Sequence, residues 1–277
     1  MKTSFVLLSL LALLALPSCR CLDSTALQEA GLDAIQKKGE LVVGIKQNAP
    51  PFSFQNAEGE YTGFDVDIAI ALAAQLELKL KLVPLESSSD RIPYIQENKV
   101  DLIIASMTIT RGRDKVIDFS IPYFQDGQGL IFRKNSAAKG YKDLKGKKVG
   151  AVNGTTSLRN MSKVQPEAQV VIYSNYANGL EGLLKGEVDA FTSDYLMLLG
   201  LRNNHAQKDE LEVKGSRFTV EPYGIGMKEN SSELRDSVNK ALMQIWSNET
   251  WSEINEKWFG EGKSYYNENY FEISLVR

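Results

Sequence analysis

The stretch VDLIIASMTITRGRDKVIDFS, residues 100–120, reads as a buried apolar strand that runs into hydroxyl and guanidinium side chains. A second stretch, VDAFTSD at residues 188–194, resembles its beginning: each starts with Val-Asp, continues as an apolar strand and ends in a polar residue. Aligning the two places Ser106 on Asp194. Coincidence between two short strands is one explanation. The order of the elements around them favours the other, which is a repeat of two similar α/β lobes.

Strands and helices alternate along the rest of the chain. The hydrophobic period predicts strands at 40–45, 80–85, 147–152 and 168–174, and helices at 64–76, 90–98, 155–164, 176–186, 195–204 and 231–259. Strands separated by helices predict parallel sheets with right-handed crossovers. The expected fold class is therefore α/β, with two similar open-sheet lobes.

The composition limits the possible function. The chain has 277 residues, of which 43% are hydrophobic and 24% charged, with a net charge of −3. Positive and negative residues are mixed, so no basic stripe is available for a phosphate backbone, and nucleic acid is not an expected partner.

The first 18 residues predict a secretory signal peptide. The apolar run Phe5–Pro17 is too short to span a bilayer and follows a basic residue, as in exported proteins. The run ends in LPSC, which resembles a bacterial lipobox, so Cys19 is a candidate for lipidation; ordinary cleavage nearby is the alternative. Cys19 and Cys21 are the only cysteines. A disulfide between them would close too tight a loop to stabilise a fold. The expected location is periplasmic, or the membrane surface as a lipoprotein.

Polar side chains at the ends of the two related strands predict a ligand site. Ligands of open α/β sheets bind beyond the carboxyl ends of the strands, so Ser106 and Asp194 would face each other across a cleft. Arg113 offers a fork that matches a carboxylate, and Ser106 and Thr108 could each donate a hydroxyl to the same anion. Asp194, the only acid expected at the cleft, suits an ammonium. Together these groups match an α-amino acid.

A helix start on the other lobe could add to this anion site. Thr155 and Thr156 lie between a strand and a helix, where backbone N–H groups favour an anion. Simple helix capping is the alternative for either threonine and for Asp194. For Arg113 the alternative is a surface salt bridge.

Three motifs carry a resemblance to a known family. GFDVDIAIALA, SMTITRGRDKVIDFSIPYF and VDAFTSD resemble the signatures of periplasmic and lipoprotein solute-binding proteins for polar amino acids, the extracellular components of ABC importers. The similarity runs from about Gly39 to Trp258. One departure is Gly112, where the family usually has an acid.

The resemblance implies roles for individual residues. It assigns Arg113 to the ligand α-carboxylate with Ser106 and Thr108 as its partners, and Asp194 to the α-ammonium. Thr155 and Thr156 match the helix-start contacts of the second lobe.

The resemblance also implies a type II periplasmic-binding-protein fold. Lobe 1 would comprise residues 38–132 and 226–259, lobe 2 residues 133–225, and the tail residues 260–277. Two hinge strands would cross between the lobes near Ile131–Lys134 and Glu221–Gly226. The closed, ligand-bound form would be recognised by an ABC permease in the membrane.

The charges predict an acidic ligand. Lys46 follows the first strand, and Arg91 resembles the arginine that acidic-amino-acid binders place against the ligand side chain. Three cations, these two and Arg113, against Asp194 complement glutamate or aspartate; glutamine or arginine is the alternative. Lys46 pointing to solvent would weaken this prediction. Phe52 is expected to form an apolar wall above the ligand methylenes.

Other functional classes are less well supported by the sequence. A dehydratase-like enzyme occurs on this fold, but no second acid is expected near the ligand, and His205 lies in a polar stretch. No metal cluster is visible and no cofactor is expected. A sensing ectodomain would need a membrane-spanning run beyond the signal peptide, and none is seen. An adhesin is compatible with a lipoprotein. A monomer is expected.

Overall fold

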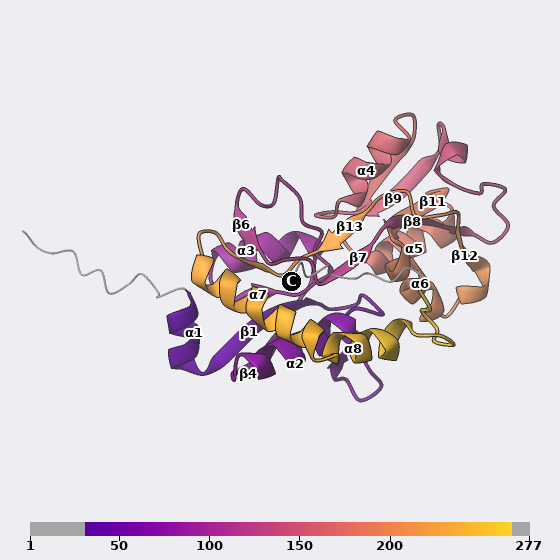
Figure 1. Ribbon diagram of the computed structural model, residues 1–277. Helices are drawn as coiled ribbons and strands as arrows, with labels where there is room; N and C mark the ends of the chain where they lie inside the picture. Colours follow the sequence, from indigo (N-terminus) through magenta and orange to yellow (C-terminus); the bar gives the residue numbers. More distant parts are fainter. Residues whose placement is uncertain (1–30, 268–277) are drawn as a thin grey trace, which may run out of the picture.

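The computed structural model describes residues 31–267 and contains two five-stranded sheets, one in each lobe (Figure 1). The first sheet has the order β4-β1-β5-β14-β6. Its strands are β1 (Glu40–Lys46), β4 (Lys79–Leu85), β5 (Leu102–Ile103), β6 (Ile117–Phe119) and β14 (Gly226–Lys228). β1 is parallel to β4 and β5, whereas β14 is antiparallel to β5 and β6.

The second sheet has the order β10-β9-β11-β8-β12. Its strands are β8 (Gln128–Arg133), β9 (Lys148–Val152), β10 (Gln169–Tyr173), β11 (Ala190–Asp194) and β12 (Leu211–Lys214). β9 is parallel to β10 and β11, and β8 is antiparallel to β11 and β12. Two open α/β sheets in separate lobes confirm the predicted fold class.

Helices pack on both sheets. The first lobe has α1 (Leu32–Lys38), α2 (Phe64–Gln75), α3 (Arg91–Gln96), α7 (Ser232–Ser247) and α8 (Thr250–Phe259), and the second has α4 (Ser157–Val164), α5 (Tyr176–Lys185) and α6 (Tyr195–Asn203). Short 3₁₀ turns lie at Ser88–Asp90, Tyr141–Leu144 and Lys208–Glu210, and β2 (Phe54–Gln55) pairs with β3 (Tyr61–Thr62). None of the helices within residues 31–267 has the length and apolar character needed to cross a bilayer.

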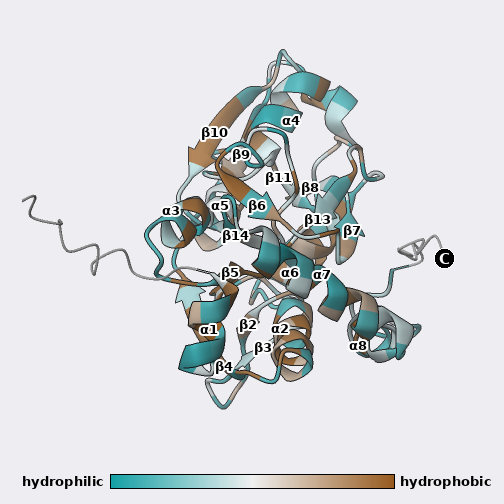
Figure 2. Cartoon of the chain, turned by 60° about the vertical axis from the view of Figure 1, so that its left-hand side comes forward, coloured by the Kyte–Doolittle hydropathy of each residue, from teal (hydrophilic) through white to brown (hydrophobic). Residues whose placement is uncertain are grey.

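The segment 231–259, predicted to be helical, is helical but contains two helices. α7 ends at Ser247, α8 begins at Thr250, and Glu249 between them adopts a left-handed conformation with φ of 66°. The buried residues of α7 recur on one face, and Figure 2 accordingly shows hydrophilic and hydrophobic segments alternating along it. Both helices pack against α2.

Two antiparallel strands connect the lobes. β7 (Phe124–Asp126) pairs with β13 (Glu221–Tyr223) between the two large sheets. The predicted second crossing coincides with β13. The predicted first crossing at Ile131–Lys134 is wrong, because Ile131 lies inside β8 of the second sheet. The chain therefore crosses earlier, at β7.

The related strands β5 and β11 have equivalent positions. The carboxylate of Asp101, just before β5, accepts the N–H of Val42 in β1 at 2.8 Å. Asp189, just before β11, accepts the N–H of Lys148 in β9 at 2.9 Å. Each aspartate thus accepts a backbone N–H from the parallel strand next to its own, β1 or β9, which explains why Val-Asp recurs at both places.

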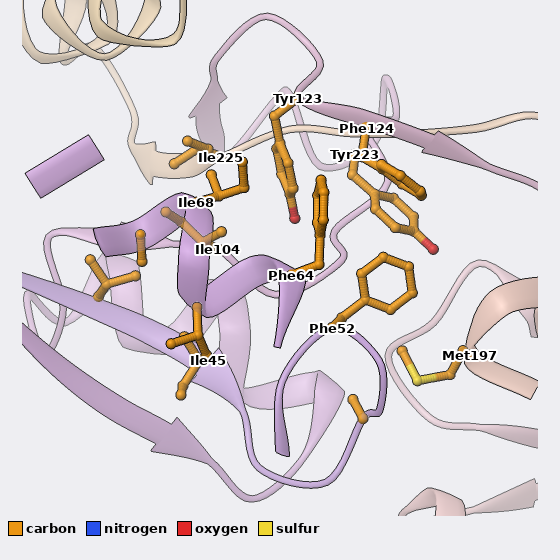
Figure 3. Close-up of a cluster of buried hydrophobic side chains, with 14 of the residues drawn as sticks. Ile45, Phe52, Phe64, Ile68, Ile104, Tyr123, Phe124, Met197, Tyr223 and Ile225 are labelled. Carbon is orange, nitrogen blue, oxygen red and sulfur yellow. The ribbon is translucent and has the colours of Figure 1, made fainter. Parts of the chain in front are cut away.

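An aromatic cluster fills the space beneath the connecting strands (Figure 3). Phe52 is fully buried, with ring centroids 5.5 Å from both Phe124 and Tyr223 and 6.2 Å from Phe64. Met197 of α6, also labelled in Figure 3, belongs to the same core cluster as Phe52, so the second lobe contributes to this core. The prediction that Phe52 forms a wall of the ligand site is wrong, because its ring belongs to the core and does not line the cavity described below.

Candidate ligand-binding site

A cavity lies between the lobes at the carboxyl ends of the strands. Eight of the predicted site residues line it: Lys46, Arg91, Ser106, Thr108, Arg113, Thr155, Thr156 and Asp194. The first five come from the first lobe and the other three from the second. The sequence did not single out Ser157, Tyr176 and Ser193, which also line the cavity. Ser157 and Ser193 adjoin predicted residues in the chain, whereas nothing local marks Tyr176.

Two arginines of the first lobe converge on one carbonyl of the second. Arg91 Nη2 and Arg113 Nη2 each donate to Gly154 O at 2.9 Å. Burial and the charge of nearby Arg91 lower the pKa of Arg113 to about 9. Burial likewise lowers the pKa of Arg91. Two desolvated like charges side by side are unfavourable unless an anion joins them, so this corner of the cavity favours a carboxylate.

The two arginines differ in how firmly they are held. Arg91, 2% exposed, also donates from Nε to Ser88 O at 2.8 Å and from Nη1 to Ala105 O at 3.2 Å. Its guanidinium is thus fixed by backbone carbonyls. Arg113 makes one further side-chain bond, from Nη1 to Thr108 O at 2.7 Å. Arg113 therefore retains more donor capacity for a ligand.

Ser106 uses its hydrogen-bond donors on a buried acid. Its N–H and its hydroxyl both donate to Asp65 Oδ2 at 2.8 Å, and the Tyr123 hydroxyl donates to Asp65 Oδ1 at 2.8 Å. Ser106 has φ of 43°, a strained conformation for this residue type that these bonds help to hold. In this arrangement the Ser106 hydroxyl, predicted to donate to the ligand carboxylate, donates to Asp65.

Thr108 and Thr156 meet on a second acid that the sequence did not reveal. Their hydroxyls, one from each lobe, donate to Glu221 Oε2 at 2.7 and 2.9 Å. Asn160 donates to Glu221 Oε1 at 2.8 Å. Burial, and then the charge of Asp194, raise the pKa of Glu221. The prediction that Asp194 is the only acid at the cleft is wrong, and the Thr108 hydroxyl, predicted to donate to the ligand carboxylate, donates to Glu221 in this arrangement.

Asp194 presents a carboxylate to the cavity from the start of α6. The Tyr223 hydroxyl donates to its Oδ2 at 2.7 Å. Asp194 occupies the N-cap position but its side chain makes no capping bond. Helix capping, the alternative considered for Asp194, therefore does not account for this carboxylate.

Lys46 is buried, with 5% of its surface exposed, so it does not point to solvent. Its ammonium lies 3.3 Å from the Tyr176 hydroxyl and 5.5 Å from the centroid of the same ring. Tyr176 begins α5 in the second lobe. The pair forms one end of the cavity and leaves ammonium hydrogens for a further acceptor.

The two threonines at the start of α4 have different roles. Thr155 Oγ1 donates to Val152 O at 2.7 Å, a bond within its own turn. Thr156 occupies the N-cap position without a side-chain capping bond. Gly154 before them has φ of 75°, and a Cβ at this position would lie 2.6 Å from Ser89 N of the first lobe. The lobes are therefore in close contact here, in a closed arrangement.

Asp65 gives the stability of the fold a pH dependence of defined sign. Burial raises its pKa to about 6, from 3.8. The folded protein therefore binds this proton more tightly than the unfolded chain, and the contribution of Asp65 to the free energy of unfolding falls as pH rises from about 4 to about 6. Asp65→Asn lacks this titration. In urea denaturation, we expect its stability relative to the parent to improve across that range.

The control for this experiment is Asp33→Asn, the same substitution at an exposed position of α1. A stability difference between Asp65→Asn and the parent that stayed constant from pH 4 to pH 7 would contradict the assignment.

Comparison with known proteins identifies the family. Residues 41–261 match the family described as bacterial extracellular solute-binding proteins, family 3. The chain belongs to this family. It is 37% identical over 267 residues to the ABC transporter glutamine-binding protein GlnH of Bacillus subtilis (strain 168), covering 93% of this chain and 97% of that protein. It is also 37% identical over 253 residues to the glutamine-binding protein of Geobacillus stearothermophilus, covering 85% and 95%.

A solved structure supports the same assignment. An ancestral arginine-binding protein bound to glutamine aligns with a TM-score of 0.76 and 38% identity, covering 80% of this chain and 99% of that one. This family 3 protein is thus an amino-acid-binding component of the ABC transporter class, and the resemblance seen in the sequence is confirmed.

Proposed function

We propose that this protein binds L-glutamine in the cavity between the lobes and delivers it to an ABC permease. The observation that carries the proposal is the balance of buried charge. Lys46, Arg91 and Arg113 are opposed by Asp194 and by two acids that accept hydrogen bonds from lining residues. Those acids are Asp65 and Glu221. A site with three cations and three acids suits a zwitterion with a neutral polar side chain.

In the proposed pose, the ligand α-carboxylate bonds to Arg113, beside Arg91. The α-ammonium bonds to Asp194 across the cleft. The buried ammonium of Lys46 donates to the side-chain amide oxygen, because a buried polar group needs a partner and an amide supplies an acceptor without adding charge. Two glutamine-binding relatives, each 37% identical to this chain, support this choice.

An acidic ligand, glutamate or aspartate, is the second candidate. Two observations favour it: Lys46 and Arg91 are both buried, and the cations that line the cavity directly outnumber the single lining acid, Asp194. It requires Asp65 and Glu221 to be largely protonated at neutral pH. Burial raises the pKa of both groups, but the pKa of Asp65 reaches only about 6, so most of Asp65 stays ionised at neutral pH, which weighs against the acidic candidate.

The substitution Lys46→Met tests the side-chain assignment. It keeps the length of the stem and removes the ammonium, so we expect glutamine affinity to fall by more than about tenfold, the loss expected for one charge-assisted hydrogen bond. The affinity for L-alanine as a ligand, which has no side-chain amide, should fall by less than threefold in the same variant. Calorimetric titration measures both ligands. The matched control is Lys79→Met, at an exposed position of β4.

Two outcomes separate the candidates. If Lys46→Met lowers glutamine affinity while the parent binds glutamine at least tenfold more tightly than glutamate, the proposal that the ligand is glutamine is supported. If the parent prefers glutamate, the acidic candidate replaces it. Unchanged glutamine affinity in Lys46→Met would remove Lys46 from the site.

We also infer that the protein is exported, anchored through a lipid on Cys19 and active as a monomer. The signal peptide at residues 1–18 and Cys19 lie outside the described residues. Membership of an extracellular solute-binding family supports export. Labelling with a radioactive fatty acid tests the anchor, since Cys19→Ser would lose the label if Cys19 is the lipidated residue.

A further inference from the structure

The chain beyond α8 reaches from the first lobe to the second. Residues 260–267, here the C-terminal strap, follow Phe259, whose ring packs in the aromatic cluster of the first lobe. In Figure 1 this yellow segment runs from the end of α8 to α6. The last described residue of the strap, Asn267, returns to the first lobe by donating its N–H to Phe259 O at 3.2 Å.

Three hydrogen bonds join the strap to the second lobe. Asn203 Nδ2, at the end of α6, donates to Ser264 O at 3.0 Å. Asn204 Nδ2 donates to the Tyr265 hydroxyl at 2.8 Å. The third bond, from Arg217 Nη2 to Asn267 Oδ1, is 3.0 Å long. The strap therefore contacts both lobes and forms a third link beside β7 and β13.

The third bond connects the strap to a strand that joins the lobes. Arg217 Nε also donates to Asp126 Oδ1 in β7 at 2.7 Å, and Asp126 Oδ2 accepts the N–H of Leu196 in α6 at 2.9 Å. The Arg217 guanidinium lies 4.4 Å from the centroid of the Tyr195 ring. One arginine thus holds the strap, the connecting strand and the first turn of α6 together.

The strap is held in a folded conformation by hydrogen bonds within it. Lys263 N donates to Gly260 O and Tyr266 N donates to Lys263 O, both at 3.1 Å, so the segment is folded into successive turns. Rotation of the lobes about β7 and β13 would move α6 relative to α8. The strap must then lose its bonds to α6 and Arg217 or unwind its own turns.

We propose that the C-terminal strap stabilises the closed arrangement of the lobes and thereby slows ligand release. The proposal rests on the proposed function. Apparent affinity is proportional to the fraction of molecules in the binding-competent state, so a restraint that disfavours opening tightens binding without touching the ligand. The effect should fall mainly on the dissociation rate.

The double variant Tyr265→Phe/Asn267→Ala tests the strap. It removes the acceptors of two bonds to the second lobe and keeps the chain length. We expect glutamine to dissociate at least about fivefold faster, measured by stopped-flow fluorescence, since each bond contributes modestly. The matched control is Tyr266→Phe, the same substitution at a tyrosine that is 48% exposed and whose hydroxyl makes no hydrogen bond within residues 31–267. It should release glutamine at the parent rate.

A second measurement needs no ligand. In small-angle X-ray scattering of ligand-free protein, the double variant and a truncation after Gly262 should have a larger radius of gyration than the parent. Equal radii together with equal dissociation rates would overturn the proposal, even while Arg113→Ala still abolished glutamine binding and upheld the site. If the parent bound no amino acid, the proposed function would fail, and the scattering comparison would decide the strap by itself.

Discussion

Arg113→Ala should lower the affinity for every amino acid by more than about 100-fold, because it removes a charged, two-pronged donor from the α-carboxylate. The loss should not depend on the ligand side chain, since the α-carboxylate is common to all amino acids. Calorimetric titration with glutamine measures the effect.

The matched control is Arg111→Ala, an exposed arginine in the same segment. It should bind glutamine like the parent. Circular dichroism distinguishes loss of the site from loss of the fold. Tight glutamine binding by a folded Arg113→Ala protein would contradict the proposed anion site.

Phe52→Ala should lower the free energy of unfolding by about 3–5 kcal/mol, because a fully buried phenylalanine is removed from a packed cluster. Urea denaturation measures the loss. Below the unfolding transition, glutamine affinity should stay within a few-fold of the parent value, since the Phe52 ring lies in the core and not along the cavity.

Two further variants serve as controls for this prediction. Phe54→Ala, at a partly exposed ring that contacts Trp258, should lose less stability. Phe52→Leu should fold with a smaller loss and still bind glutamine. A large loss of glutamine affinity in Phe52→Leu without loss of stability would indicate that Phe52 contacts the ligand, and would contradict this prediction.

Much of the fold could be predicted because the hydrophobic period and the alternation of strands and helices can be read directly along the chain. The Val-Asp repeat marks β5 and β11, and the structure gives its physical reason in the backbone N–H groups that Asp101 and Asp189 accept. The break between α7 and α8 was missed because neither glycine nor proline marks it. The first crossing was misplaced because a single residue, Gly127, separates β7 from β8.

The residues that line the cavity were easier to predict than the hydrogen bonds that they make. Polar residues at strand ends identify Ser106, Thr108 and Asp194. However, no local pattern indicates that Ser106 donates to Asp65, or that Thr108 and Thr156 share Glu221, because these partners are distant in sequence. The two acids behind the lining residues, Asp65 and Glu221, were missed for the same reason, and the predicted excess of cations among the lining residues stays a prediction about the ligand.

The most direct test of the account is a calorimetric titration of refolded, ligand-free protein with L-glutamine, L-glutamate and L-arginine under the same conditions. The charge balance of the cavity predicts saturable binding of one glutamine per protein, at least tenfold tighter than either charged amino acid. Tighter binding of glutamate or arginine, or no heat with glutamine, would contradict it.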